Sequence, residues 1–186
     1  MTRLIYVTNV SLDGFIEDER GSFAFTEPDD EQFAFVTDLV REVGTYLYGR
    51  RLYETMAVWE TDPALAAQSD LMADFAHLWQ AADKIVYSTT LNAVSTTKSR
   101  LERRFDPDSI RRMKADASRD LTAGGPNLAA HAFRAGLVDE CHLFIYPVVV
   151  GRGKPSLPSD LRAKLELLDE RRFDSGVVYV RHRIPI

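Results

Sequence analysis

The chain has 186 residues, of which 45% are hydrophobic and 27% are charged, and its formal net charge at pH 7 is −5. This length suits a single domain spanning residues 1–186, and the ordinary composition indicates a soluble globular protein that needs neither disulfides nor a metal to fold. The negative net charge argues against a dedicated nucleic-acid binder.

Features that mark secretion, membrane insertion or metal binding are lacking in this sequence. The single cysteine, Cys141, cannot form an internal disulfide, and we interpret it as a small apolar strand residue rather than a catalytic thiol. The four histidines show no metal-site spacing, so no metal is expected. Polar residues break the N-terminal apolar run, and the longest apolar run, 143–150, is too short to span a bilayer. We therefore expect a cytoplasmic protein that binds no membrane.

In the first half of the chain, strand-like and helix-like segments alternate. Strands are predicted at 4–10, 45–48 and 84–88, with a weak strand at 93–98. A first helix is predicted from Pro28-Asp29-Asp30-Glu31, with apolar residues at helical spacing up to Val43 and a cap at Gly44. Further helices are predicted to begin at Gly49 and to cover 70–82.

The second half continues the alternation and then changes character. Helices are predicted at 108–118 and 127–135, with a strand at 120–123 between them. A long strand is predicted over 138–150, bent at Pro147, and the segments 161–173 and 176–184 form a closing antiparallel pair. Repeated strand–helix–strand units predict an α/β fold: a mixed, mostly parallel central sheet with helices on both faces and a C-terminal antiparallel hairpin.

Ligands of such open sheets bind at the carboxyl ends of the strands, and one loop there carries two glycines. Gly124-Gly125-Pro126 joins a predicted strand to a predicted helix. Paired glycines let the backbone approach a ligand, and the helix N-terminus behind them favours a pyrophosphate. The same tripeptide also forms plain turns, so this loop alone leaves both interpretations open.

Two further loops carry groups that suit an anion or a ribose. In Tyr48-Gly49-Arg50-Arg51, an arginine in the first helical turn can bind a phosphate by two hydrogen bonds, although it opposes the helix dipole, or it can simply belong to a solvated helix face. In Tyr87-Ser88-Thr89-Thr90, the hydroxyls can bind a ribose or its 2′-phosphate, or can simply form a local turn.

The loop after the first strand, Ser11-Leu12-Asp13-Gly14-Phe15-Ile16, carries one carboxylate. Asp13 can hold a substrate or relay a proton, and it can equally be an Asx-turn residue.

These segments, taken in order, resemble the dihydrofolate reductase superfamily, specifically the branch of the riboflavin-biosynthesis reductase (the RibD C-terminal domain). The resembling segments span almost the whole chain: 11–16, 48–54, 84–88, the Gly124-Gly125 loop, 136–140 and 146–155. The resemblance implies a three-layer fold, NADPH as cofactor and a homodimer.

The resemblance also assigns roles to individual residues. The cofactor phosphates would lie at Gly49, Arg50 and Arg51, and the adenosine ribose at Ser88 and Thr89. The pyrophosphate would be cradled by Gly124 and Gly125, with Pro126, Asn127 and Leu128 alongside. Asp13 and Gly14 would lie near the nicotinamide and substrate, and Asp139 and Glu140 would be structural.

Two hypotheses on function follow. The first is an NADPH-dependent oxidoreductase that reduces a small heterocyclic or sugar-linked substrate, in the manner of 5-amino-6-(5-phosphoribosylamino)uracil reductase in riboflavin biosynthesis. Asp13 is its candidate catalytic and substrate-orienting residue, with Asp29 to Glu31 as alternatives. The second is a dimeric nucleotide-binding protein of the same fold with weak or no catalysis. Trp59 can line the substrate mouth or pack in the core.

Overall fold

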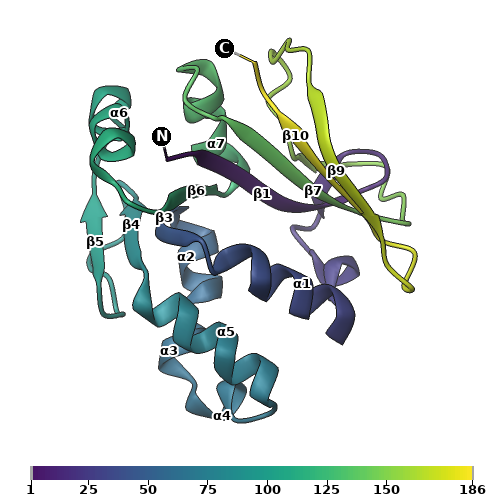
Figure 1. Ribbon diagram of the computed structural model, residues 1–186, viewed down its shortest axis with the longest axis horizontal. Coiled ribbons are helices and arrows are strands. Elements are labelled where there is room, and N and C mark those ends of the chain that lie inside the picture. The colour runs from purple at the N-terminus through teal and green to yellow at the C-terminus, as the bar shows by residue number, and fades with distance from the viewer. Residues whose placement is uncertain (1, 186) are drawn as a thin grey trace.

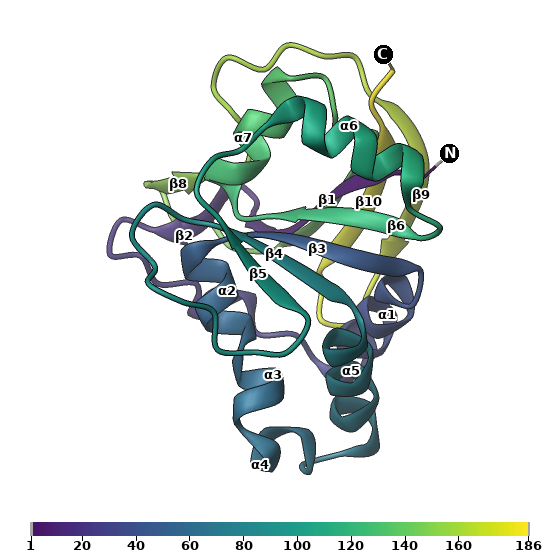
Figure 2. The same cartoon turned by 90° about the vertical axis from the view of Figure 1, so that its left-hand side faces the viewer.

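The computed structural model describes residues 2–185, which form an eight-stranded sheet, a two-stranded sheet and helices on two sides (Figures 1 and 2). The strands of the large sheet follow the order β5-β4-β3-β6-β1-β7-β10-β9. Their bounds are β1 Leu4–Ser11, β3 Val43–Gly49, β4 Asp83–Tyr87, β5 Ser99–Glu102, β6 Asp120–Gly124, β7 Glu140–Tyr146, β9 Glu166–Arg172 and β10 Val178–Arg183. The small sheet pairs β2, Phe15–Asp18, with β8, Gly153–Pro155.

Five helices connect the strands on one side of the sheet and two on the other. The first group is α1 Asp30–Val40, α2 Arg50–Met56, α3 Val58–Thr61, α4 Pro63–Ala66 and α5 Asp70–Ala81. The second group is α6 Pro107–Asp116 and α7 Pro126–Arg134, which lie above the sheet in Figure 2. A short 3₁₀ turn, Ala24–Thr26, precedes α1. None of the helices in residues 2–185 is long and apolar enough to cross a membrane.

The core lies in layers because successive strand residues point to opposite faces. In β3, Leu47 packs in the cluster that includes Leu128 and Ala132 of α7. Its neighbours Tyr46 and Tyr48 pack in the cluster with Phe75 and Trp79 of α5. A third cluster joins α1 to the C-terminal hairpin through Phe35, Phe144, Phe173 and Tyr179. Helices on both faces of the sheet are therefore confirmed.

The strand pairing confirms the predicted mixture. Neighbours from β5 to β7 run parallel, and β10 is antiparallel to both β7 and β9. The hairpin formed by β9 and β10 is anchored to the start of α1, where Glu31 accepts hydrogen bonds from the Arg171 side chain at 2.7 Å and the Asp174 backbone at 3.2 Å.

Four predicted boundaries are wrong. The weak strand at 93–98 does not form, because the Tyr53 hydroxyl accepts the N–H groups of Ser95 and Thr96, at 2.8 and 3.1 Å, and the strand begins at Ser99. The first helix ends at Val40, and Val43 and Gly44 already belong to β3.

The long strand predicted over 138–150 is also shorter than expected. It is confined to β7, which ends at Tyr146 because Pro147 has no N–H with which to continue the ladder. In the same way, the strand expected over 161–173 begins only at Glu166.

Candidate functional site

The carboxyl ends of β3 and β6 lie side by side at the point where the strand order reverses. Tyr48 pairs with Gly124 in the parallel ladder. After β3 the chain passes through α2 to α5 toward β4, whereas after β6 it passes through α7 toward β7, on the other side of the pair. Loops that diverge in this way leave a crevice, which is the usual ligand position in open α/β sheets.

Glycines from the two loops face each other in this crevice. A side-chain carbon at Gly49 would lie 4.0 Å from the Gly124 carbonyl oxygen, and one at Gly125 would lie 3.9 Å from the Gly49 nitrogen. Gly125 has φ +91°, a conformation that favours glycine. The first hydrogen bond of α7 joins Ala129 N–H to Gly125 C=O at 2.9 Å, so the N–H groups of Asn127 and Leu128 precede it. Backbone donors thus gather at the crevice.

Gly124 also meets a packing requirement that the sequence did not reveal. A side-chain carbon there would lie 2.5 Å from Leu52 Cδ2 and 2.9 Å from Tyr48 Cδ1. Gly124 therefore lets α2 pack closely on β6, and its contribution to the crevice is made by its backbone. The Leu128 side chain is likewise buried in the core, so only its backbone is available to a ligand.

The two arginines at the start of α2 point to different partners. Arg50 donates to Glu54 Oε1 at 2.8 Å and to Thr90 Oγ1 at 2.9 Å, which ties it to the turn after β4. Arg51 donates through Nη1 to Glu17 Oε1 at 3.1 Å, on β2. Both arginines are exposed. Arg50 thus bonds one of the hydroxyls after β4 that the sequence singled out, whereas the sequence did not reveal Glu17 as the partner of Arg51.

Ser88 forms a local turn. Its hydroxyl oxygen accepts the backbone N–H groups of Thr90, at 3.2 Å, and Leu91, at 2.9 Å. The Ser88 carbonyl accepts a bond from Arg103 at 3.0 Å. Thr89 is exposed beside it. The turn exposes Thr89 and Thr90 and places the Thr90 hydroxyl against Arg50.

Asp13 clamps two loops at the ends of β1 and β7. Its carboxylate accepts hydrogen bonds from the Ser11 hydroxyl at 2.6 Å and from the backbone N–H groups of Val150 and Gly151 at 3.2 and 2.7 Å. The Ser11 hydrogen bond, followed by those from the backbone, lowers the pKa of Asp13 below its usual value. Gly14 follows at φ +94°, as its position in the turn requires. Asp13 is therefore an ionised acceptor at the strand ends.

A hollow of about 270 Å³ lies next to this clamp, at the end of β7. It is lined by Phe25, Glu27, Asp29, Tyr146, Pro147, Val148, Ser175 and Val177. Asp29 also caps α1, accepting the Gln32 N–H at 2.7 Å. The Tyr146 hydroxyl donates to the Thr26 carbonyl at 2.9 Å, and burial raises its pKa to about 12. The hollow combines carboxylates and aromatic surface, which suits a small polar heterocycle.

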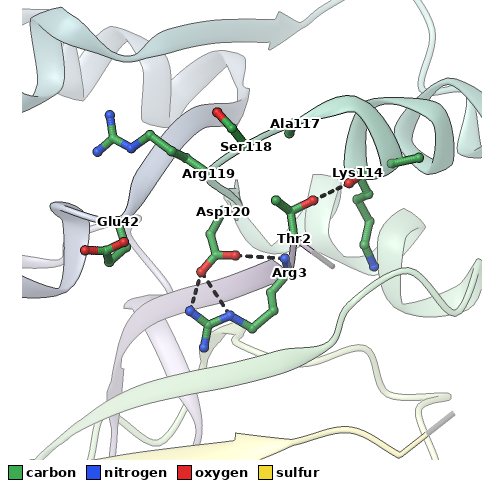
Figure 3. A pocket seen from close by; sticks show the side chains of 9 residues that line it. Thr2, Arg3, Glu42, Lys114, Ala117, Ser118, Arg119 and Asp120 are labelled. Carbon is green, nitrogen blue, oxygen red and sulfur yellow. Dashed lines mark hydrogen bonds and ion pairs between the residues drawn. The ribbon is translucent and has the colours of Figure 1, made fainter.

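Another hollow, of about 750 Å³, opens at the opposite ends of the strands (Figure 3). Three of the charged side chains that line it are in ion pairs: Arg3 bonds Asp120 and also Glu140, and Lys114 lies 2.6 Å from Asp139. Burial raises the pKa of Glu140, but hydrogen bonds from Arg181, His142 and Arg3 outweigh it and bring the pKa to about 2. This hollow lies away from the strand ends that bind ligands in such folds, and its ion pairs fix the starts of β1, β6 and β7.

Other candidates have structural positions. Trp59 packs against Phe33 and Phe75, with ring centroids 5.8 and 4.7 Å apart. Cys141 is buried in β7, and burial raises its pKa to about 12. Within residues 2–185, no three His, Cys, Asp or Glu side chains are grouped to hold a metal ion.

Comparison with known proteins identifies relatives of the whole chain. The family model described as the RibD C-terminal domain matches residues 2–179. The uncharacterized protein YyaP of Bacillus subtilis (strain 168) is 30% identical over 182 residues, covering 96% of this chain and 93% of YyaP.

Solved structures share the fold at low identity. A putative riboflavin biosynthesis protein of Shewanella sp. PV-4 superposes with a TM-score of 0.77 at 18% identity, and both chains are fully covered. A pyrimidine reductase-like protein of Corynebacterium diphtheriae gives 0.66 at 13% identity, covering all of this chain and 92% of the other.

A third structure is that of a larger protein. The diaminohydroxyphosphoribosylaminopyrimidine deaminase/5-amino-6-(5-phosphoribosylamino)uracil reductase of Thermotoga maritima gives a TM-score of 0.65 at 17% identity. The alignment covers 99% of this chain and 57% of the Thermotoga chain.

Proposed function

This chain belongs to the RibD C-terminal domain family, and we propose that it is a reductase that uses NADPH to reduce a small heterocyclic or sugar-linked substrate. Its structural neighbours include a 5-amino-6-(5-phosphoribosylamino)uracil reductase and a pyrimidine reductase-like protein, which favours an aminopyrimidine as that substrate. When bound, NADPH supplies the hydride, and the protein contributes binding, orientation and the exclusion of water.

The observation that carries the proposal is the crevice between β3 and β6. Gly49 and Gly125 leave it free of side chains, and the start of α7 adds backbone donors. This combination fits a pyrophosphate. Arg50 beside the turn 88–90 fits a phosphorylated ribose, because a guanidinium binds phosphate through paired hydrogen bonds. The cofactor would be held by Gly49, Arg50, Ser88, Thr89 and Gly125, and by the backbone of Gly124, Pro126, Asn127 and Leu128.

The substrate side is proposed at the ends of β1 and β7. Ser11 and Tyr146 are partners in the ladder, so the Asp13 clamp and the hollow at Tyr146 adjoin each other. Asp13 and Gly14 would border the substrate, and the ionised Asp13 would orient it through N–H or O–H groups. Glu27 and Asp29 in the hollow would favour a ring rich in N–H donors.

A turnover assay tests the proposal. Oxidation of NADPH is followed by absorbance with 5-amino-6-(5-phosphoribosylamino)uracil, the compound named for the Thermotoga relative, and with other aminopyrimidines. We expect oxidation that depends on one of these compounds and falls at least tenfold in Arg50→Ala. Arg111→Ala is the control, because Arg111 pairs with Asp108 on α6, away from the crevice. No substrate-dependent oxidation, despite tight NADPH binding, would contradict the enzymatic part.

Two observations favour the second candidate, a dimeric nucleotide-binding protein with little catalysis. The Asp13 carboxylate is already used by three donors within the chain. Leu165, Leu167 and Val178 at the C-terminal hairpin are also exposed, at 43%, 52% and 38%, which suits contact with a second copy. Tight binding without turnover, together with a dimer by sedimentation, would select this candidate.

A further inference from the structure

The segment 15–22, called the flap here, contacts the cofactor crevice through one arginine. The flap consists of β2 and the turn after it, and Figure 2 shows β2 between β8 and α2. Glu17 of β2 pairs with Arg51 at 3.1 Å. Gly21, in the turn, is also close, since a side-chain carbon there would lie 3.4 Å from Arg51 Nη2. Both parts of the flap therefore lie against Arg51.

The two members of this pair differ in exposure. The Glu17 side chain is 13% exposed, whereas that of Arg51 is 64% exposed. Glu17 is fixed by its strand, because β2 pairs with β8 and the Gly153 backbone fits closely against it: a side-chain carbon at Gly153 would lie 1.8 Å from the Glu17 carbonyl oxygen. The guanidinium is thus the mobile partner of a fixed carboxylate.

Arg51 and Arg50 reach in opposite directions across the strand ends. Arg50 reaches the turn after β4, on one side of β3. Arg51 reaches the segment that follows β1, on the other side, where β6 lies between β3 and β1. The Arg51–Glu17 pair therefore belongs to the pyrophosphate side of the crevice, where Gly124 and Gly125 end β6.

We infer that the Glu17 carboxylate competes with a pyrophosphate for the guanidinium of Arg51. The inference rests on the proposed function. Carboxylate and phosphate are alternative partners of a guanidinium, and Arg51 gives up Glu17 when it holds a phosphate oxygen. Because the pyrophosphate is common to NADPH and NADH, Glu17 affects both nucleotides equally, whereas Arg50 discriminates between them.

Calorimetric titration of the full chain with NADPH and NADH at low salt tests this inference. In Glu17→Gln we expect the affinity for both nucleotides to rise by the same factor, up to about fivefold, which is the scale of one partly exposed ion pair. The increase is expected to vanish when Arg51→Gln is already present, because the two residues act through each other. Glu166→Gln, which breaks the Arg183 pair on the hairpin, is the matched control and should leave both affinities unchanged.

Unchanged or weaker nucleotide binding in Glu17→Gln, with an unaltered melting temperature, would overturn the inference. The inference would also be overturned if the increase in nucleotide affinity persisted in the presence of Arg51→Gln, or if it were confined to NADPH. If the wild type binds neither nucleotide, the proposed function fails, and inorganic pyrophosphate then serves as the probe. If Glu17→Gln then binds pyrophosphate more tightly than the wild type, the inferred competition between Glu17 and the anion for Arg51 is supported. If it does not, the competition is rejected.

Discussion

At the scale of single residues, the hydrogen bonds around Asp13 decide what its carboxylate can do. Ser11, Val150 and Gly151 all donate to it and lower its pKa, so it stays ionised throughout the neutral range. The stabilisation from these bonds is present above its unfolded pKa and is lost only as the pH falls through the lower, folded value. An ionised carboxylate orients a donor-rich substrate, but it does not give up a proton near pH 7.

Replacing Asp13 by Asn tests this role. We expect turnover to fall at least tenfold while NADPH affinity is retained, because Asp13 adjoins the substrate side rather than the phosphate crevice. The ratio of wild-type to variant turnover should be constant from pH 6 to pH 8, since Asp13 does not titrate there. Unchanged turnover would show that Asp13 has no part in the mechanism. A ratio of wild-type to variant turnover that varies with pH would show that Asp13 titrates in this range.

At the scale of secondary-structure elements, the position of α2 depends on the absence of a side chain at Gly124. A methyl group there would lie 2.5 Å from Leu52 Cδ2, within the contact that seats α2 on β6. Since Gly49 and Arg50 begin this helix, its packing also sets the width of the crevice.

Gly124→Ala is therefore expected to lower the free energy of unfolding by about 1–3 kcal/mol, the usual cost of overpacking. It should also weaken NADPH binding. Urea denaturation measures the first effect and calorimetry the second. Adding Leu52→Ala removes the clashing methyl and should recover part of the nucleotide affinity. If Gly124→Ala is as stable as the wild type, the close packing of α2 on β6 is not what requires glycine here.

The elements that the sequence predicted well are those with a local signal. Capping acids and apolar spacing located α1, and the β-rich run 4–10 located β1. The elements it missed are defined by distant partners: β2 and β8 are short and pair with each other, and residues 93–98 bond to the Tyr53 hydroxyl instead of forming a strand. Such contacts leave no periodic pattern in the sequence.

The residues of the candidate site also divide into those with a local sequence signal and those defined by distant partners. The strand-end position of Gly49, Arg50 and Ser88 followed from the alternation of strands and helices. The Arg51–Glu17 pair did not, because it joins two strand ends 34 residues apart through side chains alone. Nor could sequence alone separate the two glycines, of which Gly125 meets a backbone requirement and Gly124 a packing requirement.

At the scale of the whole molecule, the amino ends and the carboxyl ends of the parallel strands carry different sets of residues. At the amino ends, Arg3, Asp120, Glu140 and Arg181 form a paired ionic network that fixes the strand starts. At the carboxyl ends, glycines, arginines and hydroxyl groups gather around the crevice between β3 and β6. We propose that this end binds NADPH and that Arg50 recognises its ribose phosphate.

The most direct test is calorimetric titration of the apo protein with NADPH and NADH, in parallel for the wild type and Arg50→Ala. We predict that the wild type binds NADPH more tightly than NADH, because only NADPH carries the 2′-phosphate. The Arg50→Ala change should reduce NADPH affinity at least tenfold and leave NADH affinity within twofold, on the scale of a charge-assisted hydrogen bond of about 1.5–3 kcal/mol. Binding of neither nucleotide, or an equal loss for both in Arg50→Ala, would contradict the claim.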